Sequence, residues 1–343
     1  MSHARTLVRL LADPQGAGGV ADWTGLLSAA RAESLLGTLA FRLHGAPLPA
    51  KVSAIFESAR RDAGHARTQA LWEGEMARRA LAPTGVPVIL LKGTAYAAAD
   101  LPASLGRSIG DLDILVPRSS LDGVEAALIA AGWEWVKPDP YDDLYYRRWM
   151  HELPPLIHQS RDRMIDVHHT ILPLTARPTP DAAAMIASSV ALDGGLRTLA
   201  PADMVIHAVA HLFADGDLAG GLRNLWDIDR MLRDFGAEPG FWPLLADRAR
   251  LHQLLPHVAR ALRLAARLYG TPVDCAIAGR ATAFAAIFDD LCERRLLARD
   301  GWGRPTRPVL RLAFYIRSHW LRMPPLMLAR HLWTKARSRP ARA

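Results

Sequence analysis

Apolar side chains recur at the spacing of amphipathic helices through the first 82 residues. Residues 23–45 carry Leu, Ala and Phe side chains three and four positions apart and end at Gly45, a residue type that commonly follows a helix. Residues 51–81 continue this spacing until Pro83, the first of several helix breakers. The pattern predicts an N-terminal helical region over residues 1–82.

Between residues 83 and 175 the pattern changes to short apolar runs separated by turns. Residues 86–91 are a continuous run of β-branched and apolar side chains, which is typical of a buried strand. A second strand is expected at Asp111–Pro117. Further strands are expected at residues 133–138, 153–158 and 163–169, and helices at residues 94–100 and 119–131.

The chain returns to helical spacing after Pro180, and apolar, aromatic and Arg side chains alternate beyond Arg304. Pro324 and Pro325 are expected to split this last stretch into two short helices. We therefore expect an α+β fold, with a small mixed-sheet core flanked by N-terminal and C-terminal helical regions. The expected boundaries are 1–82 for the N-terminal helical region, 83–175 for the α+β core, 176–300 for a helical domain and 301–343 for a basic amphipathic tail.

The composition describes an ordinary globular protein of the reducing cytosol. Half of the residues are apolar and 22% are charged, so the chain can bury a large core and is not globally disordered. Its two cysteines exclude a disulfide framework. No run of about 18 apolar residues predicts a membrane-spanning helix, and the N-terminus lacks the long apolar segment of a signal peptide. We expect a cytoplasmic protein.

The net charge of +8 is concentrated at the C-terminus. Residues 301–343 contain ten Arg or Lys and no acidic residue, so residues 1–300 hold 32 basic and 34 acidic side chains. A near-neutral body argues against a nucleic-acid partner, because neutralising phosphates requires a basic face on the folded domain. The tail is expected to pack on the body as terminal helices, or else to contact the inner membrane surface peripherally through residues 304–343.

The most informative motif is the acidic pair Asp111 and Asp113 at the start of the second predicted strand. Alternate strand residues point to the same face, so the two carboxylates would project to one side about 7 Å apart along the strand. Carboxylates on one face repel each other unless a cation lies between them, and oxygen ligands of this kind suit Mg²⁺ or Mn²⁺. The alternative is that Asp111 only caps the preceding loop.

A third carboxylate, Asp166, lies between apolar residues in the predicted strand at 163–169. If this strand lies beside the first acidic strand, the three acids converge. Three carboxylates can hold two cations, which then clamp the attacking and leaving oxygens in phosphoryl or nucleotidyl transfer. The alternative for Asp166 is an acid exposed on an edge strand.

Candidate phosphate-binding residues precede the acidic pair. A predicted strand turns into a helix at Lys92, Gly93 and Thr94. An anion there could approach the backbone at Gly93 and contact the hydroxyl of Thr94 and the ammonium of Lys92. Arg107 and Ser108 lie in the loop just before the acidic pair and could also reach phosphate oxygens. The alternatives are an exposed lysine at the end of the strand and an arginine that is solvated or paired with an active-site aspartate.

This arrangement of strand, Gly-Thr, helix, Asp-x-Asp strand and a later lone Asp resembles the nucleotidyltransferase superfamily with a DNA polymerase beta-like core. Residues 90–117 in particular look like an uncharacterised bacterial branch of that superfamily, with Lys-Gly before the first helix and an Arg shortly before the acidic pair. The strong likeness covers about residues 86–170 and a weaker one extends to about residue 235. The superfamily commonly has Gly-Ser where this chain has Gly93-Thr94, which keeps the hydroxyl.

The resemblance implies Mg²⁺-dependent transfer of a nucleoside monophosphate from an NTP, with ATP expected, to a hydroxyl or phosphate of an acceptor that is a small molecule, a peptide or a protein. Asp111 and Asp113 would bind two Mg²⁺ ions, with Mn²⁺ as a substitute, and Asp166 would complete the second site. Gly93, Thr94 and Ser108 would hold the triphosphate, and Lys92 or Arg107 would offset its charge. The alternative function is a catalytically weak nucleotide-binding or assembly module, docked to a membrane through its tail.

Other polar residues receive structural interpretations. His168 shares a strand face with Asp166 and is expected to be a packed or hydrogen-bonded histidine, with a supporting contact to the site as the alternative. His207 and His211 have the spacing of a zinc pair, but no third ligand is evident. Asp227 is expected to form helix salt bridges, with an orientation toward the cleft as the alternative.

Overall fold

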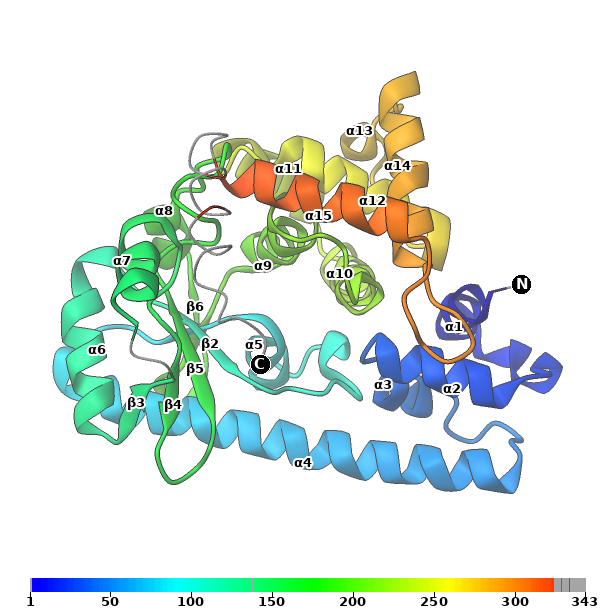
Figure 1. Cartoon of the computed structure of the whole chain (residues 1–343), viewed down its shortest axis with the longest axis horizontal. Helices are drawn as coiled ribbons and strands as arrows, with labels where there is room; N and C mark the ends of the chain where they lie inside the picture. Colours follow the sequence, from blue (N-terminus) through cyan, green and yellow to red (C-terminus); the bar gives the residue numbers. More distant parts are fainter. Residues whose placement is uncertain (1, 137–138, 324–327, 329–332, 334–343) are drawn as a thin grey trace.

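The computed structural model describes residues 2–136 and 139–323 together with residues 328 and 333. Its N-terminal region is helical (Figure 1). Ser2 and Asp22 cap the first two helices through side-chain oxygens that accept backbone N–H groups. The long helix α4 runs beneath the whole molecule, from the N-terminal helices to the sheet (Figure 1). The helices of this region are α1 (His3–Ala12), α2 (Trp23–Ala32), α3 (Leu36–Arg42) and α4 (Ala50–Leu81).

The centre of the described chain is a mixed sheet with strand order β3-β4-β5-β2-β1-β7-β6. Strand β2 is parallel to β5 and antiparallel to β1, and every residue of β2 is buried. The strands are β1 (Ile89–Leu90), β2 (Leu112–Leu115), β3 (Trp133–Trp135), β4 (Leu156–His158), β5 (Met164–His168), β6 (Val190–Ala191) and β7 (Arg197–Thr198). The α+β prediction is confirmed, and each strand expected between residues 86 and 169 is present with shorter bounds.

Helices surround this sheet: α5 (Lys92–Ala98), α6 (Leu121–Ala130), α7 (Pro140–Trp149) and α8 (Ala182–Ala187). The sequence did not predict α7, which has little apolar periodicity to reveal it. In the structure Arg147 of α7 is paired with Glu125 of α6 at 2.8 Å and with Asp143 one turn earlier. A tertiary ion pair thus supports a helix that the hydrophobic pattern does not indicate.

Strands β6 and β7 differ from the helical prediction made for the chain after Pro180. Gly194 and Gly195 adopt positive φ values of 81° and 89°, which allow the chain to reverse between the two strands. Strand β7 then lies parallel to β1, with Ile89 opposite Arg197. The sheet therefore includes residues beyond position 175, the expected end of the α+β core.

The C-terminal helices pack above the sheet and around the central pair α9 and α10 (Figure 1). They are α9 (Pro201–Val209), which continues as a π-helical segment over Ala210–Asp215, then α10 (Gly221–Phe235), α11 (Phe241–Leu251), α12 (Leu255–Tyr269), α13 (Cys275–Ala278), α14 (Ala283–Leu296) and α15 (Pro308–Arg322). Within the described ranges, no helix combines the length and apolarity needed to cross a bilayer.

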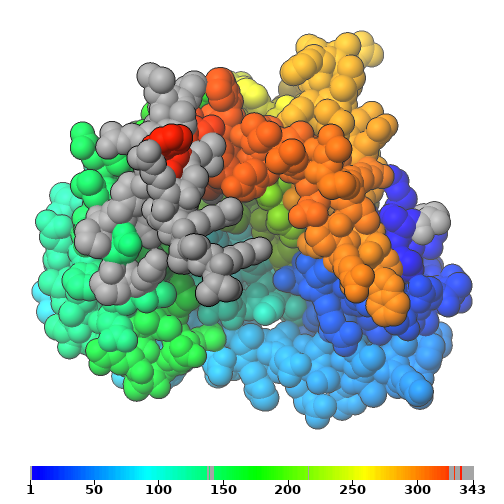
Figure 2. Space-filling view, viewed as in Figure 1, coloured from blue at the N-terminus to red at the C-terminus, as the bar shows by residue number. Residues whose placement is uncertain are grey.

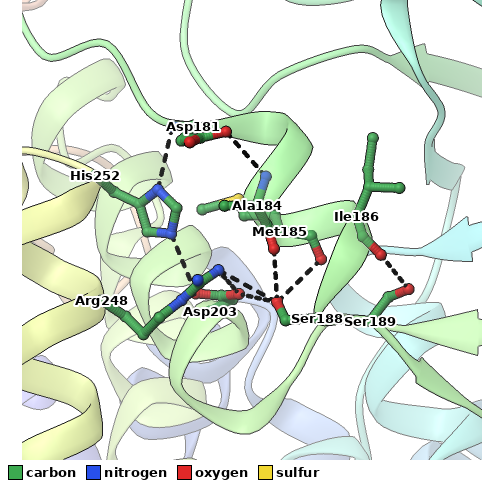
Figure 3. Close-up of polar contacts among 9 residues, drawn as sticks. All are labelled: Asp181, Ala184, Met185, Ile186, Ser188, Ser189, Asp203, Arg248 and His252. Atoms are coloured by element: carbon green, nitrogen blue, oxygen red, sulfur yellow. Dashed lines mark hydrogen bonds and ion pairs between the residues drawn. The ribbon is translucent and has the colours of Figure 1, made fainter.

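A buried carboxylate on α9 is bonded to α11 and to the residue that follows α8, and His252 links it to the segment before α8 (Figure 3). Asp203 is fully buried and accepts hydrogen bonds from Arg248 at 2.8 Å and from Ser188 at 3.0 Å. His252 lies 3.2 Å from the same carboxylate through Nε2, and its Nδ1 accepts the backbone N–H of Asp181. Because each ring nitrogen has a partner, we assign this cluster a structural role.

The two ends of the described chain share one hydrophobic core, which extends from Ala4 to Phe314. Arg299 pairs with the buried Glu33 at 2.6 Å and donates to the carbonyl of Ala32. In Figure 2 the orange segment near residue 300 lies against the blue N-terminal helices.

Helix α15 packs through the buried residues Phe314 and Ser318. This helix is the first of the two predicted in the tail; beyond Pro325 the structure describes residues 328 and 333 alone, so the second predicted helix lies outside the described ranges.

A close backbone contact connects the N-terminal helices to the loop that precedes the acidic pair. A Cβ added at Gly37 in α3 would lie 2.4 Å from the carbonyl oxygen of Gly106. Gly106 itself has a φ of 70°, a conformation that side chains rarely adopt. The position of this loop therefore depends on two glycines that are distant in the sequence.

Candidate active site

Three carboxylates converge at one end of strands β2 and β5. The two strands are parallel and in register, with Asp113 directly opposite Asp166, so both side chains leave the same face of the sheet. Asp111 lies two residues before Asp113, just outside β2. Each of the three offers an oxygen, and these oxygens lie within 4.8 Å of one another. The convergence expected from a neighbouring acidic strand is thus present in the fold.

The three carboxylates differ in environment. Asp111 is exposed, whereas Asp113 is 2% exposed. Burial, together with the nearby carboxylates of Glu152 and Asp113, raises the pKa of Asp166 to about 7. Burial alone would also raise the pKa of Asp113, but the Lys92 ammonium and a hydrogen bond from His168 hold that pKa well below its usual range.

Lys92 reaches Asp113 because strand β1 ends beside the start of β2. The backbone N–H of Leu91 donates to the carbonyl of Asp113, and Lys92 follows with its Nζ 2.6 Å from Asp113 Oδ1. Burial alone would lower the pKa of Lys92, but the Asp113 carboxylate raises it above its ordinary value. Lys92 has a φ of 47°, and a non-glycine residue held in this region indicates strain of the kind found at functional sites.

Gly93 and Arg107 are in direct contact. A Cβ at Gly93 would lie 2.6 Å from Arg107 Nε, so this position accepts only glycine without a shift of the guanidinium. The guanidinium is paired with Asp227 of α10 and lies over the ring of Tyr96, 5.6 Å from its centroid. This contact fits the expected alternative of an arginine paired with an aspartate near the site, and it places Asp227 at the site.

Arg223, one turn before Asp227, also pairs with it and is buried. The sequence offered only a weak signal for Asp227, because i and i+4 pairs of opposite charge occur on many exposed helices. Its burial between two arginines is a tertiary property.

Thr94 is buried in the first turn of α5, and its hydroxyl has no hydrogen-bond partner among the described residues. A buried hydroxyl without a partner is costly, so this side chain is available to a ligand oxygen. The triphosphate contact expected for Thr94 stays a prediction.

A small pocket of about 40 Å³ adjoins the carboxylates. It is lined by Lys92, Tyr96, Arg107, His207, Ala208, His211, Asn224 and Asp227. The lining residues come from the α+β core and from the C-terminal helices α9 and α10, so the helical region completes this part of the site.

Within the described part of the chain, His207 and His211 belong to no group of three candidate metal ligands. Their spacing therefore has a different explanation, which is that both side chains face this pocket.

Ser108 is the predicted site residue that the structure places elsewhere. Its side chain is exposed and lines a second pocket together with Ser34, Gly37 and Asp62. The triphosphate contact expected for Ser108 stays a prediction.

Two residues that the sequence did not assign to the site lie against it. His168 is 2% exposed, and its Nε2 lies 2.9 Å from Asp113 Oδ1, which fits the alternative of a histidine that supports the site. Its Nδ1 lies 3.4 Å from Glu152 Oε2. Glu152 precedes β4 and gave no sequence signal, and an isolated bridge pairs its backbone with that of His168.

The donor set fits a hard divalent cation. Asp166 keeps a pKa of about 7 because neighbouring carboxylates and burial both disfavour its charge. A divalent cation among the three carboxylates would relieve this repulsion, and carboxylate oxygens are the ligands that Mg²⁺ and Mn²⁺ prefer. Asp111, Asp113 and Asp166 are therefore the residues that would hold the ion.

Comparison with known proteins identifies the family of this chain. A search of curated proteins finds no match. A family model described as an uncharacterised nucleotidyltransferase matches residues 19–270, which include the sheet, the three carboxylates and the helices α9 and α10. Because this match spans most of the chain, the protein belongs to the uncharacterised nucleotidyltransferase family.

Proposed function

We propose that this protein moves a nucleoside monophosphate from an NTP, with ATP expected, to a hydroxyl or phosphate of an acceptor in a Mg²⁺-dependent reaction. The observation that carries the proposal is the group of three carboxylates from two in-register parallel strands, with oxygens within 4.8 Å of one another. Bound Mg²⁺ would supply charge neutralisation and Lewis acidity at the phosphates. The acceptor is a small molecule, a peptide or a protein.

The chain's own residues have distinct tasks in this reaction. Lys92 and Arg107 line one pocket and bring positive charge toward the triphosphate. The unpartnered hydroxyl of Thr94 and the backbone at Gly93 are available to phosphate oxygens. The acceptor oxygen attacks the α-phosphorus, the bond between the α-phosphorus and its bridging oxygen breaks, and pyrophosphate leaves.

Asp166 is suited to take the proton of an acceptor hydroxyl. A bound cation would lower the pKa of the Asp166 carboxyl from about 7, so the carboxylate would be ionised and able to accept that proton. The low pKa of Asp113 keeps that carboxylate ionised, so that it can bind the cation. Two acids on neighbouring strands thus have separate roles that follow from their environments.

A nucleotide-binding module without turnover is the second candidate function. The observation that favours it is the contact between Lys92 Nζ and Asp113 Oδ1 at 2.6 Å, because a bound ammonium competes with a metal ion for the same oxygen. Product formation separates the two candidates.

The test uses ATP labelled at the α- or the γ-phosphate, incubated with Mg²⁺ and candidate acceptors. Nucleotidyl transfer puts the α-label on the acceptor and releases the γ-label as pyrophosphate, whereas phosphoryl transfer puts the γ-label on the acceptor. We expect Asp111→Asn combined with Asp113→Asn to abolish pyrophosphate release. Asp247→Asn, an exposed carboxylate on α11, is the matched control. Pyrophosphate release that survives unchanged in the double variant refutes the proposal.

We also propose peripheral membrane contact through residues 304–343. Helix α15 exposes Val309, Leu312 and Ile316, whose exposed fractions are 82%, 58% and 55%. Exposed apolar side chains on a helix that belongs to a strongly basic segment suit an anionic interface. Sedimentation with anionic and with neutral vesicles tests this: binding to neither contradicts it.

A further inference from the structure

A second group of candidate ligands lies beside the catalytic carboxylates but contains different chemistry. His151 and Glu152 occupy the segment between α7 and β4, and His168 is the last residue of β5. Each offers one ligand atom, and these atoms lie within 4.8 Å of one another. Two imidazoles and one carboxylate are the donors of transition-metal sites, in contrast to the all-oxygen set of the three aspartates.

The spacing of the ligand atoms fits a tetrahedral ion. Glu152 Oε2 lies 3.4 Å from His168 Nδ1 and 3.7 Å from His151 Nε2. Ligands about 2.0–2.1 Å from a tetrahedral zinc ion are separated from each other by about 3.4 Å. The observed separations are close to this value, so a small shift of side chains would suffice for coordination.

The hydrogen bonding of His168 provides independent support. Its Nε2 lies 2.9 Å from Asp113 Oδ1, so Nε2 carries the proton and donates to that carboxylate. The other ring nitrogen, Nδ1, is buried, has no hydrogen-bond partner among the described residues and lies 3.4 Å from Glu152 Oε2. Metal-binding histidines typically donate their other ring N–H to a carboxylate, and this is the arrangement found here.

His151 lies close to both other candidate ligands. Its Nε2 is 3.7 Å from Glu152 Oε2, and its ring centroid is 5.2 Å from that of His168.

We infer that His151, Glu152 and His168 bind one transition-metal ion of the zinc class, through His151 Nε2, Glu152 Oε2 and His168 Nδ1, with a fourth position left to water or a ligand. The site is separate from the Mg²⁺ site but shares Asp113 with it, because Asp113 accepts the hydrogen bond of the ligand His168. An ion at this site would hold His168, and through it Asp113, in one orientation. The inference does not depend on the proposed nucleotidyl transfer.

The experiment measures metal binding directly. The full chain is freed of metal with a chelator and titrated with Co²⁺, whose visible absorption reports tetrahedral coordination, and with Zn²⁺ in equilibrium dialysis in the presence of excess Mg²⁺. We expect one equivalent of tightly bound Zn²⁺ and a Co²⁺ spectrum with nitrogen and oxygen ligands. His151→Ala is expected to weaken binding by at least about tenfold, the effect typical of losing even an outer partner.

His257→Ala is the matched control. His257 also has a buried Nδ1 without a hydrogen-bond partner among the described residues, but it belongs to no candidate ligand group there, so Zn²⁺ binding should not change. Glu152→Gln removes a ligand charge with little change in shape and serves if His151→Ala fails to fold, as judged by circular dichroism.

Asp111→Asn separates this inference from the proposed function. Asp111 belongs to the aspartate group and not to the histidine group, so this variant should lose Mg²⁺-dependent turnover and keep the Zn²⁺ equivalent. The inference is wrong if the wild type binds no Zn²⁺. It is also wrong if Asp111→Asn removes the ion while His151→Ala and Glu152→Gln retain it, which would assign the ion to the aspartates.

Discussion

The substitution Asp166→Asn should stabilise the metal-free protein at neutral and alkaline pH while it impairs catalysis. The pKa of Asp166 is raised from 3.8 to about 7 by burial and by neighbouring carboxylates. Between these two values the folded state binds a proton that the unfolded state has released. Stability therefore falls as pH rises from about 4 to about 7 and stays reduced above that range. Asparagine has a similar shape and no charge, so the stability of the variant does not fall with rising pH through this group.

The size of the effect follows from the two pKa values. The difference between 3.8 and about 7 corresponds to about 4 kcal/mol at about 1.4 kcal/mol for each pKa unit. Asp166 is partly exposed, so solvent screening makes this an upper value. The stability difference between variant and wild type should grow by about 2–3 kcal/mol between about pH 5 and about pH 8.

Urea unfolding at several pH values, in buffers with a chelator, measures this difference. Comparing the two proteins at each pH cancels the contributions of other titrating groups. Adding Mg²⁺ should then stabilise the wild type at pH 8 more than the variant, by about 2.7 kcal/mol when the ion is present at about 100 times its dissociation constant. The reasoning fails if the stability difference is independent of pH, or if the variant is the less stable protein at pH 8.

Three further predictions concern two glycines in close contacts and one buried carboxylate. Gly93→Ala should raise the KM for ATP at least severalfold without unfolding the protein, because the new Cβ would displace the guanidinium of Arg107, 2.6 Å away; an unchanged KM would contradict the contact. Asp203→Asn should lower the free energy of unfolding by about 2–3 kcal/mol, since it removes the buried charge that accepts hydrogen bonds from the half-buried Arg248, and denaturant melts should show less than about 1 kcal/mol for the exposed Asp247→Asn. Gly37→Ala should destabilise the protein by about 1–3 kcal/mol, because its Cβ would lie 2.4 Å from a backbone oxygen, and a melt identical to that of the wild type would exclude the close approach.

The candidate site was predictable wherever its signal lies in one short segment. Asp111 and Asp113 show their common face through the two-residue period of a strand, and Lys92-Gly93-Thr94 marks a junction of strand and helix. The structure keeps both features, with β2 at Leu112–Leu115 and α5 beginning at Lys92. Local periodicity is a property of the backbone, so it can be recognised before any tertiary contact is known.

Other parts depend on contacts between residues that are distant in the chain. Arg107 and Asp227 are 120 residues apart and meet because α10 packs beside the loop before β2. Strand β7 is too short to show a period and becomes a strand because β1 offers an edge to pair with. Helix α7 has no apolar stripe and is supported by an ion pair to α6.

The amino-acid sequence by itself determined the α+β class and the acidic strand, because these follow from spacing within segments, and its short motifs resemble those of nucleotidyltransferases. Tertiary structure decided that Asp166 lies opposite Asp113, because strand register depends on the packing of the whole sheet. It also decided that Glu152 and His168 lie together beside Asp113, because their side chains come from separate segments that only the folded sheet brings into contact.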